Sequence, residues 1–159
     1  MNKSLPAVIA LMLSLVLVGA GAVMLYQGID ARTEVRTALA AENITTPDDA
    51  SIPGVPVDSA ATAMSQAEII QDHTLATTEG QTWADMDRED PMRQYYLSAV
   101  TLRTSLMSAY MAFKLADLVI GLGALFLVIG LGGGAATTLT LRQSTTTATS
   151  TRERELTTA

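Results

Sequence analysis

The stretch PMRQYYLSAVTLRTSLMSAYMAFKLADLVIGLGALFLVIGL, residues 91–131, decides the fold. Asp90 precedes Pro91, and an acidic residue followed by proline is typical of a helix N-cap and first turn. No further proline or stop signal occurs before Gly132, Gly133 and Gly134. We therefore expect one helix of roughly 40 residues, about 60 Å long at 1.5 Å per residue.

The second half of this helix, residues 110–131, is apolar and long enough to cross a bilayer core of about 30 Å. The first half must then stand outside the membrane. A second apolar block, Pro6 to Tyr26, carries no charge and follows a start that contains Lys3. A signal peptide cleaved after Ala22 has the same features. The apolar run continues to Tyr26, which favours a membrane anchor.

The composition fits a small membrane protein. Of the 159 residues, 48% are hydrophobic and only 16% are charged. There is no cysteine, so a disulfide framework or thiolate metal site is excluded. The net charge is −6, and residues 27–105 hold thirteen of the sixteen acidic residues against five arginines. Such a segment repels phosphate backbones, which argues against a nucleic-acid partner.

The segment between the apolar blocks reads as a folded cap. The first helix should continue to about Glu42, because helix-forming residues dominate after Gly28. Prolines and a glycine in residues 43–58 predict an ordered extended connection. A helix capped by Asp58 or Ser59 should run to about Thr77 and end at Gly80. A capping pair, Thr82 and Asp85, then predicts a one-turn helix that carries Trp83.

Together these elements predict an all-α membrane protein. Two transmembrane helices form an antiparallel hairpin with long extramembrane extensions and a small helical cap. The predicted parts are the first span, residues 1–26, a cap and loop, 27–109, the second span, 110–131, and a disordered threonine-rich tail, 132–159. Lys3 and the signal-like start favour cytoplasmic termini, so residues 27–109 would be extracytoplasmic in the cell membrane.

No catalytic or cofactor site can be assembled from these residues. His73 is the single histidine, whereas iron oxygenase and zinc sites generally need more such ligands. The acidic residues Asp85, Asp87, Glu89 and Asp90 could hold a hard cation such as calcium, but they lack the features of an EF-hand loop. Carboxylates at a helix N-terminus favour the macrodipole, so capping is the preferred interpretation. We predict no enzyme activity, cofactor or metal.

Small residues are the strongest interaction signal, because they let helices approach closely in lipid. They lie on the second span at Ala109, Ala112, Ala116, Gly121, Gly123 and Gly130, and on the first at Gly19, Ala20, Gly21 and Ala22. A heptad-like seam alternates four and three residues along Leu102, Leu106, Ala109, Phe113, Ala116, Ile120, Gly123, Leu127 and Gly130. One seam serves the hairpin, and a second face could serve another chain.

Lys114 and Asp117 are the charged residues of the second span, and Lys114 lies close to its outer end. They lie three residues apart, and Lys114 can snorkel outward while it pairs with Asp117. Anchoring at the membrane interface is the preferred role. A polar contact with a partner subunit and an ion or proton pathway are the alternatives.

Four segments resemble a group of two-span membrane proteins of actinobacteria, many labelled aromatic ring-opening dioxygenase. The segments are ITTPDDA (44–50), SQAEIIQDHTLATTEGQTWADMDREDPMRQ (65–94), SAVTLRTSLMSAYMAF (98–113) and DLVIGLGALFLVIG (117–130). The likeness covers most of residues 20–131 and implies the two-span fold and an actinobacterial setting. The dioxygenase label would require two histidines and one carboxylate around iron.

The function expected from these features is that of a non-enzymatic accessory or structural subunit. It would dock on a larger membrane complex, or form a homo-oligomer, through its small-residue spans and acidic cap. The alternative is a self-assembling membrane protein that binds a small ligand or cation in the cap.

Overall fold

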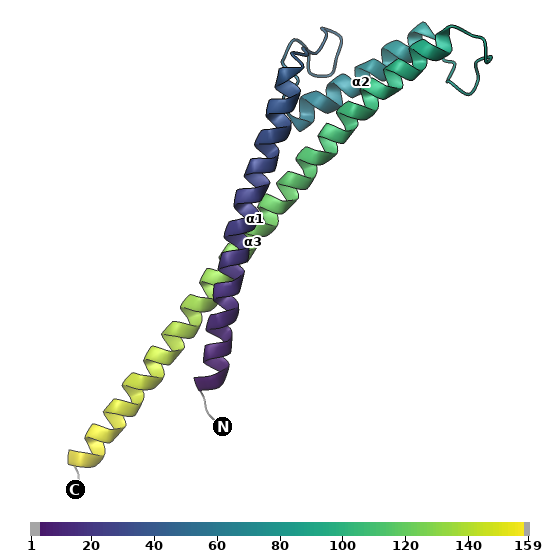
Figure 1. Ribbon diagram of the computed structural model, residues 1–159. Helices are drawn as coiled ribbons and strands as arrows, with labels where there is room; N and C mark the ends of the chain where they lie inside the picture. Colours follow the sequence, from purple (N-terminus) through teal and green to yellow (C-terminus); the bar gives the residue numbers. More distant parts are fainter. Residues whose placement is uncertain (1–3, 158–159) are drawn as a thin grey trace. The chain divides into compact units, whose positions relative to one another are not determined.

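The computed structural model describes the backbone of residues 4–157 and the side chains of residues 5–142. Three helices make up the described elements: α1 (Ser4–Ala41), α2 (Ala60–Thr77) and α3 (Met92–Thr157) (Figure 1). The described residues contain no strand, only an isolated bridge between Thr45 and Pro56. The all-helical class predicted from the sequence is therefore confirmed.

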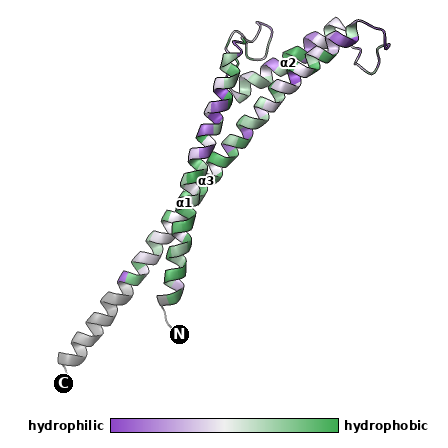
Figure 2. Cartoon of the chain, in the orientation of Figure 1, coloured by the Kyte–Doolittle hydropathy of each residue, from purple (hydrophilic) through white to green (hydrophobic). Residues whose placement is uncertain are grey.

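The chain divides into two compact units. One, here called the apolar unit, contains α1 up to Gln27 and α3 from Val119. The other, here called the cap unit, runs from Gly28 to Leu118 and contains the rest of α1, all of α2 and the start of α3. Hydrophobic residues dominate the described part of the apolar unit, and hydrophilic residues are concentrated in the cap unit (Figure 2).

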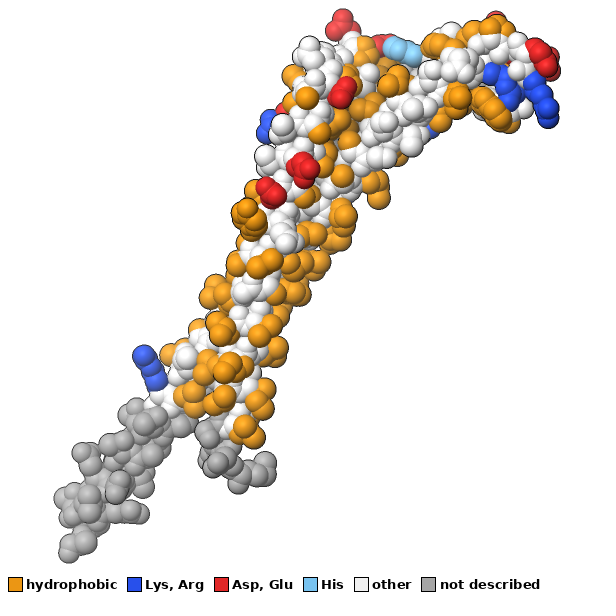
Figure 3. Space-filling model, viewed as in Figure 1, with side chains coloured by type: hydrophobic (Ala, Val, Ile, Leu, Met, Phe, Trp, Pro, Cys, Tyr) orange, Lys and Arg blue, Asp and Glu red, His pale blue; other side chains and the backbone are white. Residues whose placement is uncertain are grey.

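Both α1 and α3 contain a stretch long and apolar enough to cross a membrane. Only 6% of that stretch in α1 and 17% in α3 is buried within the protein. Both stretches are therefore much less buried than the core helix of a water-soluble protein, which would be mostly buried. Apolar side chains cover the apolar unit in the space-filling view (Figure 3).

The helix starts follow the capping residues predicted from the sequence. Ser59 caps α2, where its hydroxyl accepts a hydrogen bond from the Thr62 amide while the Thr62 hydroxyl accepts one from the Ser59 amide. Asp90 caps α3 through a 2.8 Å hydrogen bond from the Met92 amide to its Oδ1. The predicted end of α2 at Gly80 is also confirmed, since Gly80 has a φ of +80° and its amide donates to the Leu75 carbonyl.

The connection from 43 to 58 is ordered, as predicted, and packs onto the helices. The Thr46 amide donates a 3.0 Å hydrogen bond to the Val55 carbonyl, and the Val55 amide donates a 3.1 Å hydrogen bond to the Thr46 hydroxyl. Val57 is 1% exposed and forms the core of the cap unit with Ala63, Ala67 and Leu106. Burial of these apolar side chains is what holds α2 and the connection to α3.

Two predicted features are wrong. The segment with Trp83 forms turns, because Thr82 and Asp85 bond one another, with 2.9 and 2.6 Å hydrogen bonds, and no further helical turn follows. In addition, α3 does not end at Gly132, Gly133 and Gly134 but continues to Thr157, so the tail predicted to be disordered is helical over residues 132–157.

The glycines are compatible with this continuation. Because they lack side chains, α3 can stay helical where it lies close to α1. Gly133 and Gly134 lie against Ser14 of α1. Thr137 also donates a 2.9 Å hydrogen bond to the Gly133 carbonyl, a bond that is compatible with helical backbone. Glycine in a helix costs about 1 kcal/mol relative to alanine, and this cost does not end α3 at these three positions.

Candidate functional site

In the apolar unit, α1 and α3 touch through glycines. A methyl group added to Gly21 would lie 2.7 Å from the Gly123 carbonyl oxygen, and one added to Gly130 would lie 2.8 Å from the Ser14 carbonyl oxygen. Backbone therefore lies against backbone at both points. Contact positions rise along α1, from Ser14 to Gly21, as they fall along α3, from Gly130 to Gly123.

The predicted seam on α3 matches the observed burial. Leu106, Phe113, Ala116, Gly123 and Gly130 are buried, and Ala109, Ile120 and Leu127 are half-buried. Leu102 is the exception, with 59% of its surface exposed. An alternation of four and three residues thus describes the face of α3 that packs inside the protein.

Small residues recur at every seventh position of this packing. On α1 the series is Ala7, Ser14, Gly21 and Gly28, and on α3 it is Ala109, Ala116, Gly123 and Gly130. All eight are buried or half-buried. We call this set the small-residue ladder. It explains the close approach, because a seven-residue repeat keeps the same face of each helix toward its neighbour.

The remaining predicted small residues are placed differently. Gly121 and Gly19 are exposed, and an added methyl group would meet nothing within 4 Å at either position. Ala112 is half-buried and lines a groove in the cap unit. Of the predicted small interaction residues, Ala109, Ala116 and Gly123 therefore belong to the ladder, whereas Gly121 faces outward and Ala112 lines the groove.

The predicted pair of Lys114 with Asp117 is wrong. Asp117 instead forms a 3.5 Å ion pair with Arg32 of α1. The Lys114 amine lies 5.5 Å from the centre of the Tyr110 ring, one turn toward the start of α3, where it makes a cation–π contact. The side chain of a helical residue tilts toward the N-terminus, so Lys114 points away from Asp117.

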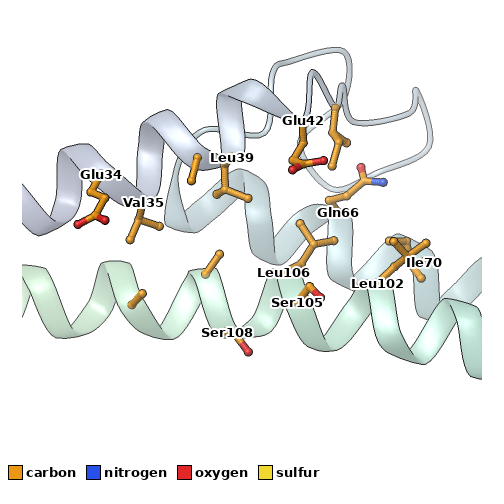
Figure 4. Close-up of a pocket in the computed structure, with 14 residues that line it drawn as sticks. Glu34, Val35, Leu39, Glu42, Gln66, Ile70, Leu102, Ser105, Leu106 and Ser108 are labelled. Atoms are coloured by element: carbon orange, nitrogen blue, oxygen red, sulfur yellow. The ribbon is translucent and has the colours of Figure 1, made fainter.

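A groove of about 910 Å³ lies in the cap unit between α1 and α3, with α2 behind it (Figure 4). Its walls are mostly apolar, with Val35, Leu39, Ile70, Leu102 and Leu106 directed into it. A second hollow of about 240 Å³ shares Ile70 and Leu102 with the groove and extends to Tyr95. Along α3 the combined lining runs from Tyr95 to Ala112, about 26 Å at 1.5 Å per residue.

The polar groups of the groove are mainly hydrogen-bond acceptors. Glu34 and Glu42 of α1 are exposed at its edge, and neither has an ion-pair partner among the described residues. Gln66 of α2 also lines it, and the Gln66 Oε1 atom is buried without a hydrogen-bond partner in the described part of the chain. No lysine or arginine lines the groove or the second hollow.

The candidate ligand residues of the cap serve structural contacts. His73 Nε2 lies 2.7 Å from the Asp49 carboxylate, which fastens the 43–58 connection to α2, and this hydrogen bond lowers the pKa of Asp49. Hydrogen bonds from the Thr82 hydroxyl and amide lower the pKa of Asp85. Within residues 5–142, no group of three or more potential ligands is close enough to hold a metal ion.

The connection has two further attachments. Arg36 of α1 donates to Asp58 at 2.6 and 3.0 Å, and the Ser65 hydroxyl of α2 accepts hydrogen bonds from the Ile52 amide and the Ser51 hydroxyl. With the His73 contact, α1 and α2, two of the three helices that line the groove, hold the same segment. The lining of the groove is therefore fixed by the folding of the cap unit.

Sequence reasoning missed Arg32, Glu34, Glu42 and Gln66. Which charges of the first helix face the second helix depends on the rotation of one helix against the other, and the sequence of one helix does not give this rotation. A signal was present in the seven-residue series, in which Val35 and Glu42 follow Gly28 where small residues would continue the close contact.

Comparison of the chain with models of protein families, with curated proteins and with solved structures gives no match.

Proposed function

We propose that the chain is a non-enzymatic two-span membrane protein, an accessory subunit that docks on a larger membrane complex. In this proposal α1 and α3 form an antiparallel transmembrane hairpin, both termini are cytoplasmic, and the cap unit is extracytoplasmic. The resemblance to two-span actinobacterial proteins is part of the same proposal.

The exposed apolar surfaces of the two long helices support insertion in a bilayer. Leu15 and Val16 of α1 are 68% and 65% exposed, and Val128 of α3 is 70% exposed. Burial in lipid removes these side chains from water, which stabilises the inserted state by about 25 cal/mol per Å² of apolar surface. In the bilayer a helix also satisfies its own backbone hydrogen bonds, which is required where no water is present.

The glycine contacts support the hairpin and favour an anchor over a cleaved signal peptide. Removal of residues 1–22 would delete Ser14 and Gly21, which contact Gly130 and Gly123. Because lipid supplies no hydrophobic drive between helices, such close van der Waals contacts are what hold spans together. The opposite order of contacts on α1 and α3 fits antiparallel helices.

The docking role depends mainly on one observation, the apolar groove of the cap unit. Leu102 is more than half exposed in this groove although its helix has a buried face available. Apolar concavities with a polar rim are typical of binding sites. The cap unit is also acidic, with fourteen acidic side chains against six lysines and arginines, and a charged surface selects partners of opposite charge.

Purification in mild detergent, followed by mass spectrometry, tests the docking role. A photo-crosslinking amino acid at Leu102, in the groove, should attach to the same companion protein that copurifies. The matched control is the same crosslinker at Ala61, an exposed residue of α2 outside the groove. A chain that purifies repeatedly as a monomer or homodimer, with no crosslinked companion, would contradict the proposal.

A small-ligand function is the second candidate, favoured by the volume of the groove. About 910 Å³ lies within the range of roughly 300–1,000 Å³ found for small-molecule sites. In this alternative the protein self-assembles and the ligand, or a cation, binds in the cap. Calorimetry of the purified protein with calcium and with zinc tests the cation version, for which heat with a saturable midpoint is expected. Absence of heat would remove it.

A further inference from the structure

The occupant of the groove can be specified from its shape and its charges. The apolar lining extends about 26 Å along α3 and is partly open to solvent. Figure 4 shows labelled side chains from α1, α2 and α3 that face this space. An elongated open groove with apolar walls fits a helix laid along it, in the way that amphipathic helices bind to hydrophobic grooves. Side chains three and four residues apart on that helix would contact Leu39, Ile70 and Leu102.

The rim carboxylates give the occupant its charge. Glu34 and Glu42 lie eight residues apart on α1, about 12 Å along the helix axis. A single cationic headgroup cannot contact two carboxylates at that separation, whereas two basic side chains about two turns apart on one helix can.

A second copy of this chain fits the groove poorly. The cap unit carries an excess of eight acidic side chains, so two cap units repel one another. The described part of the chain supplies no exposed helix with an apolar stripe and two basic residues two turns apart outside the cap unit itself. These charges favour an occupant from another protein over a second cap unit.

We propose that the groove binds an amphipathic α-helix of a partner protein, with an apolar stripe along its length and two lysines or arginines about two turns apart. The basic side chains pair with Glu34 and Glu42 while the apolar stripe covers Leu39, Ile70 and Leu102. This inference rests on the proposed docking function and specifies the chemistry of the partner.

A designed peptide tests the inference. The full chain is placed in phosphatidylcholine nanodiscs and titrated against a fluorescent 18-residue helix with a leucine stripe and two lysines eight residues apart, with empty discs as background. The same helix with glutamates in place of the lysines is the charge control. Saturable binding of the lysine peptide, at least tenfold tighter than that of the glutamate peptide, is expected.

Variants of the chain locate the binding. Glu34→Gln with Glu42→Gln should weaken the lysine peptide about fivefold, since exposed pairs contribute modestly. Glu68→Gln with Glu79→Gln removes the same charge from exposed positions outside the groove and should change binding less than twofold. Ser105→Trp, at an exposed position of the lining, should obstruct the groove and abolish binding.

Three results would overturn the inference: no saturable binding of the lysine peptide, equal binding of the two peptides, or a glutamate dependence shown by dodecylamine and not by the peptide. The last result would assign the groove to a small cationic amphiphile. A companion protein that copurifies with the Ser105→Trp variant, in which the groove is obstructed, as well as with the wild type would refute the inference and leave the docking function standing. Binding of the lysine peptide, with no companion protein found in native membranes, would support the helix-binding groove and contradict the docking function.

Discussion

The same two helices, α1 and α3, pack differently in the apolar unit and in the cap unit. In the apolar unit their backbones touch at Gly21 and Gly123, whereas in the cap unit a groove of about 910 Å³ lies between them. The seven-residue series explains the difference. It holds only glycine, alanine and serine in the apolar unit. It is still small at Gly28, Ala116 and Ala109 in the cap unit, and then continues with Val35 and Glu42 on α1 and Leu102 on α3, along the groove.

The comparison teaches that the size of the residue at every seventh position sets how closely these two helices pack. Where the residue is small, van der Waals contact between backbones holds the helices. Where it is large, the helices need other support, which α2 and the 43–58 connection supply through the core at Val57 and Leu106. The two units should therefore respond to different substitutions.

The largest effect is expected in the core of the cap unit. Leu106→Ala should lower the free energy of unfolding by about 2–5 kcal/mol, because Leu106 is 5% exposed and its removal leaves a cavity. Leu102→Ala, one turn away, should cost less than about 0.5 kcal/mol, because Leu102 is 59% exposed. Steric trapping in bicelles measures both losses, and equal losses would show that Leu102 is packed in the core as Leu106 is.

In the apolar unit, the decisive substitution adds a single methyl group. Gly21→Ala should lower the free energy of unfolding by about 1–2 kcal/mol, since the methyl group would lie 2.7 Å from a carbonyl oxygen and overpacking outweighs the better helix propensity of alanine. Gly19→Ala is the matched control, with nothing within 4 Å, and should be neutral or slightly stabilising. The same assay applies, and a stabilising Gly21→Ala would contradict the close contact.

A smaller effect is expected from the ion pair that links α1 and α3 in the cap unit. Arg32 and Asp117 are 56% and 44% exposed, so a double-mutant cycle with Arg32→Gln and Asp117→Asn should give a coupling of about 0.2–1 kcal/mol. The cycle of Lys114→Gln with Asp117→Asn should give no coupling, because these two side chains do not pair. The reverse ranking would restore the pair that was predicted from the sequence.

The smallest effect concerns the contact between the 43–58 connection and α2. The hydrogen bond from His73 lowers the pKa of Asp49 below its usual range, so its contribution to stability is present above the unfolded-state pKa and is lost as the pH falls through the lower folded-state pKa. NMR titration of the Asp49 carboxyl should show a midpoint that rises in the His73→Ala variant. An unchanged midpoint would mean that the pair does not persist in solution.

Much of the fold could be predicted from local signals. Capping requires particular residue types. The sequence therefore predicts the start of α2 from Ser59, its end from Gly80 and the start of α3 from Asp90. The seam on α3 followed from its heptad spacing. The end of α3 could not be predicted from Gly132, Gly133 and Gly134, because glycine in lipid-associated helices can mark close packing as readily as a helix stop.

The candidate site was less accessible to sequence reasoning. Ala116 and Gly123 were identified as packing residues, but Gly121 was grouped with them although it faces outward, since composition alone does not give rotation about the helix axis. The groove depends on three segments far apart in sequence, with Glu34 on α1, Gln66 on α2 and Leu102 on α3. The contact of His73 with Asp49 likewise spans 24 residues, and no periodic pattern relates the two.

Disulfide crosslinking in native membranes tests most directly whether α1 and α3 form an antiparallel pair. The chain contains no cysteine, and an added Cβ on Gly133 would lie 3.2 Å from the Ser14 hydroxyl oxygen, which suits a disulfide. Ser14→Cys with Gly133→Cys should form an intramolecular disulfide on mild oxidation, and Ser14→Cys with Gly121→Cys should not. Equal crosslinking of the two pairs, or crosslinks only between chains, would contradict the account.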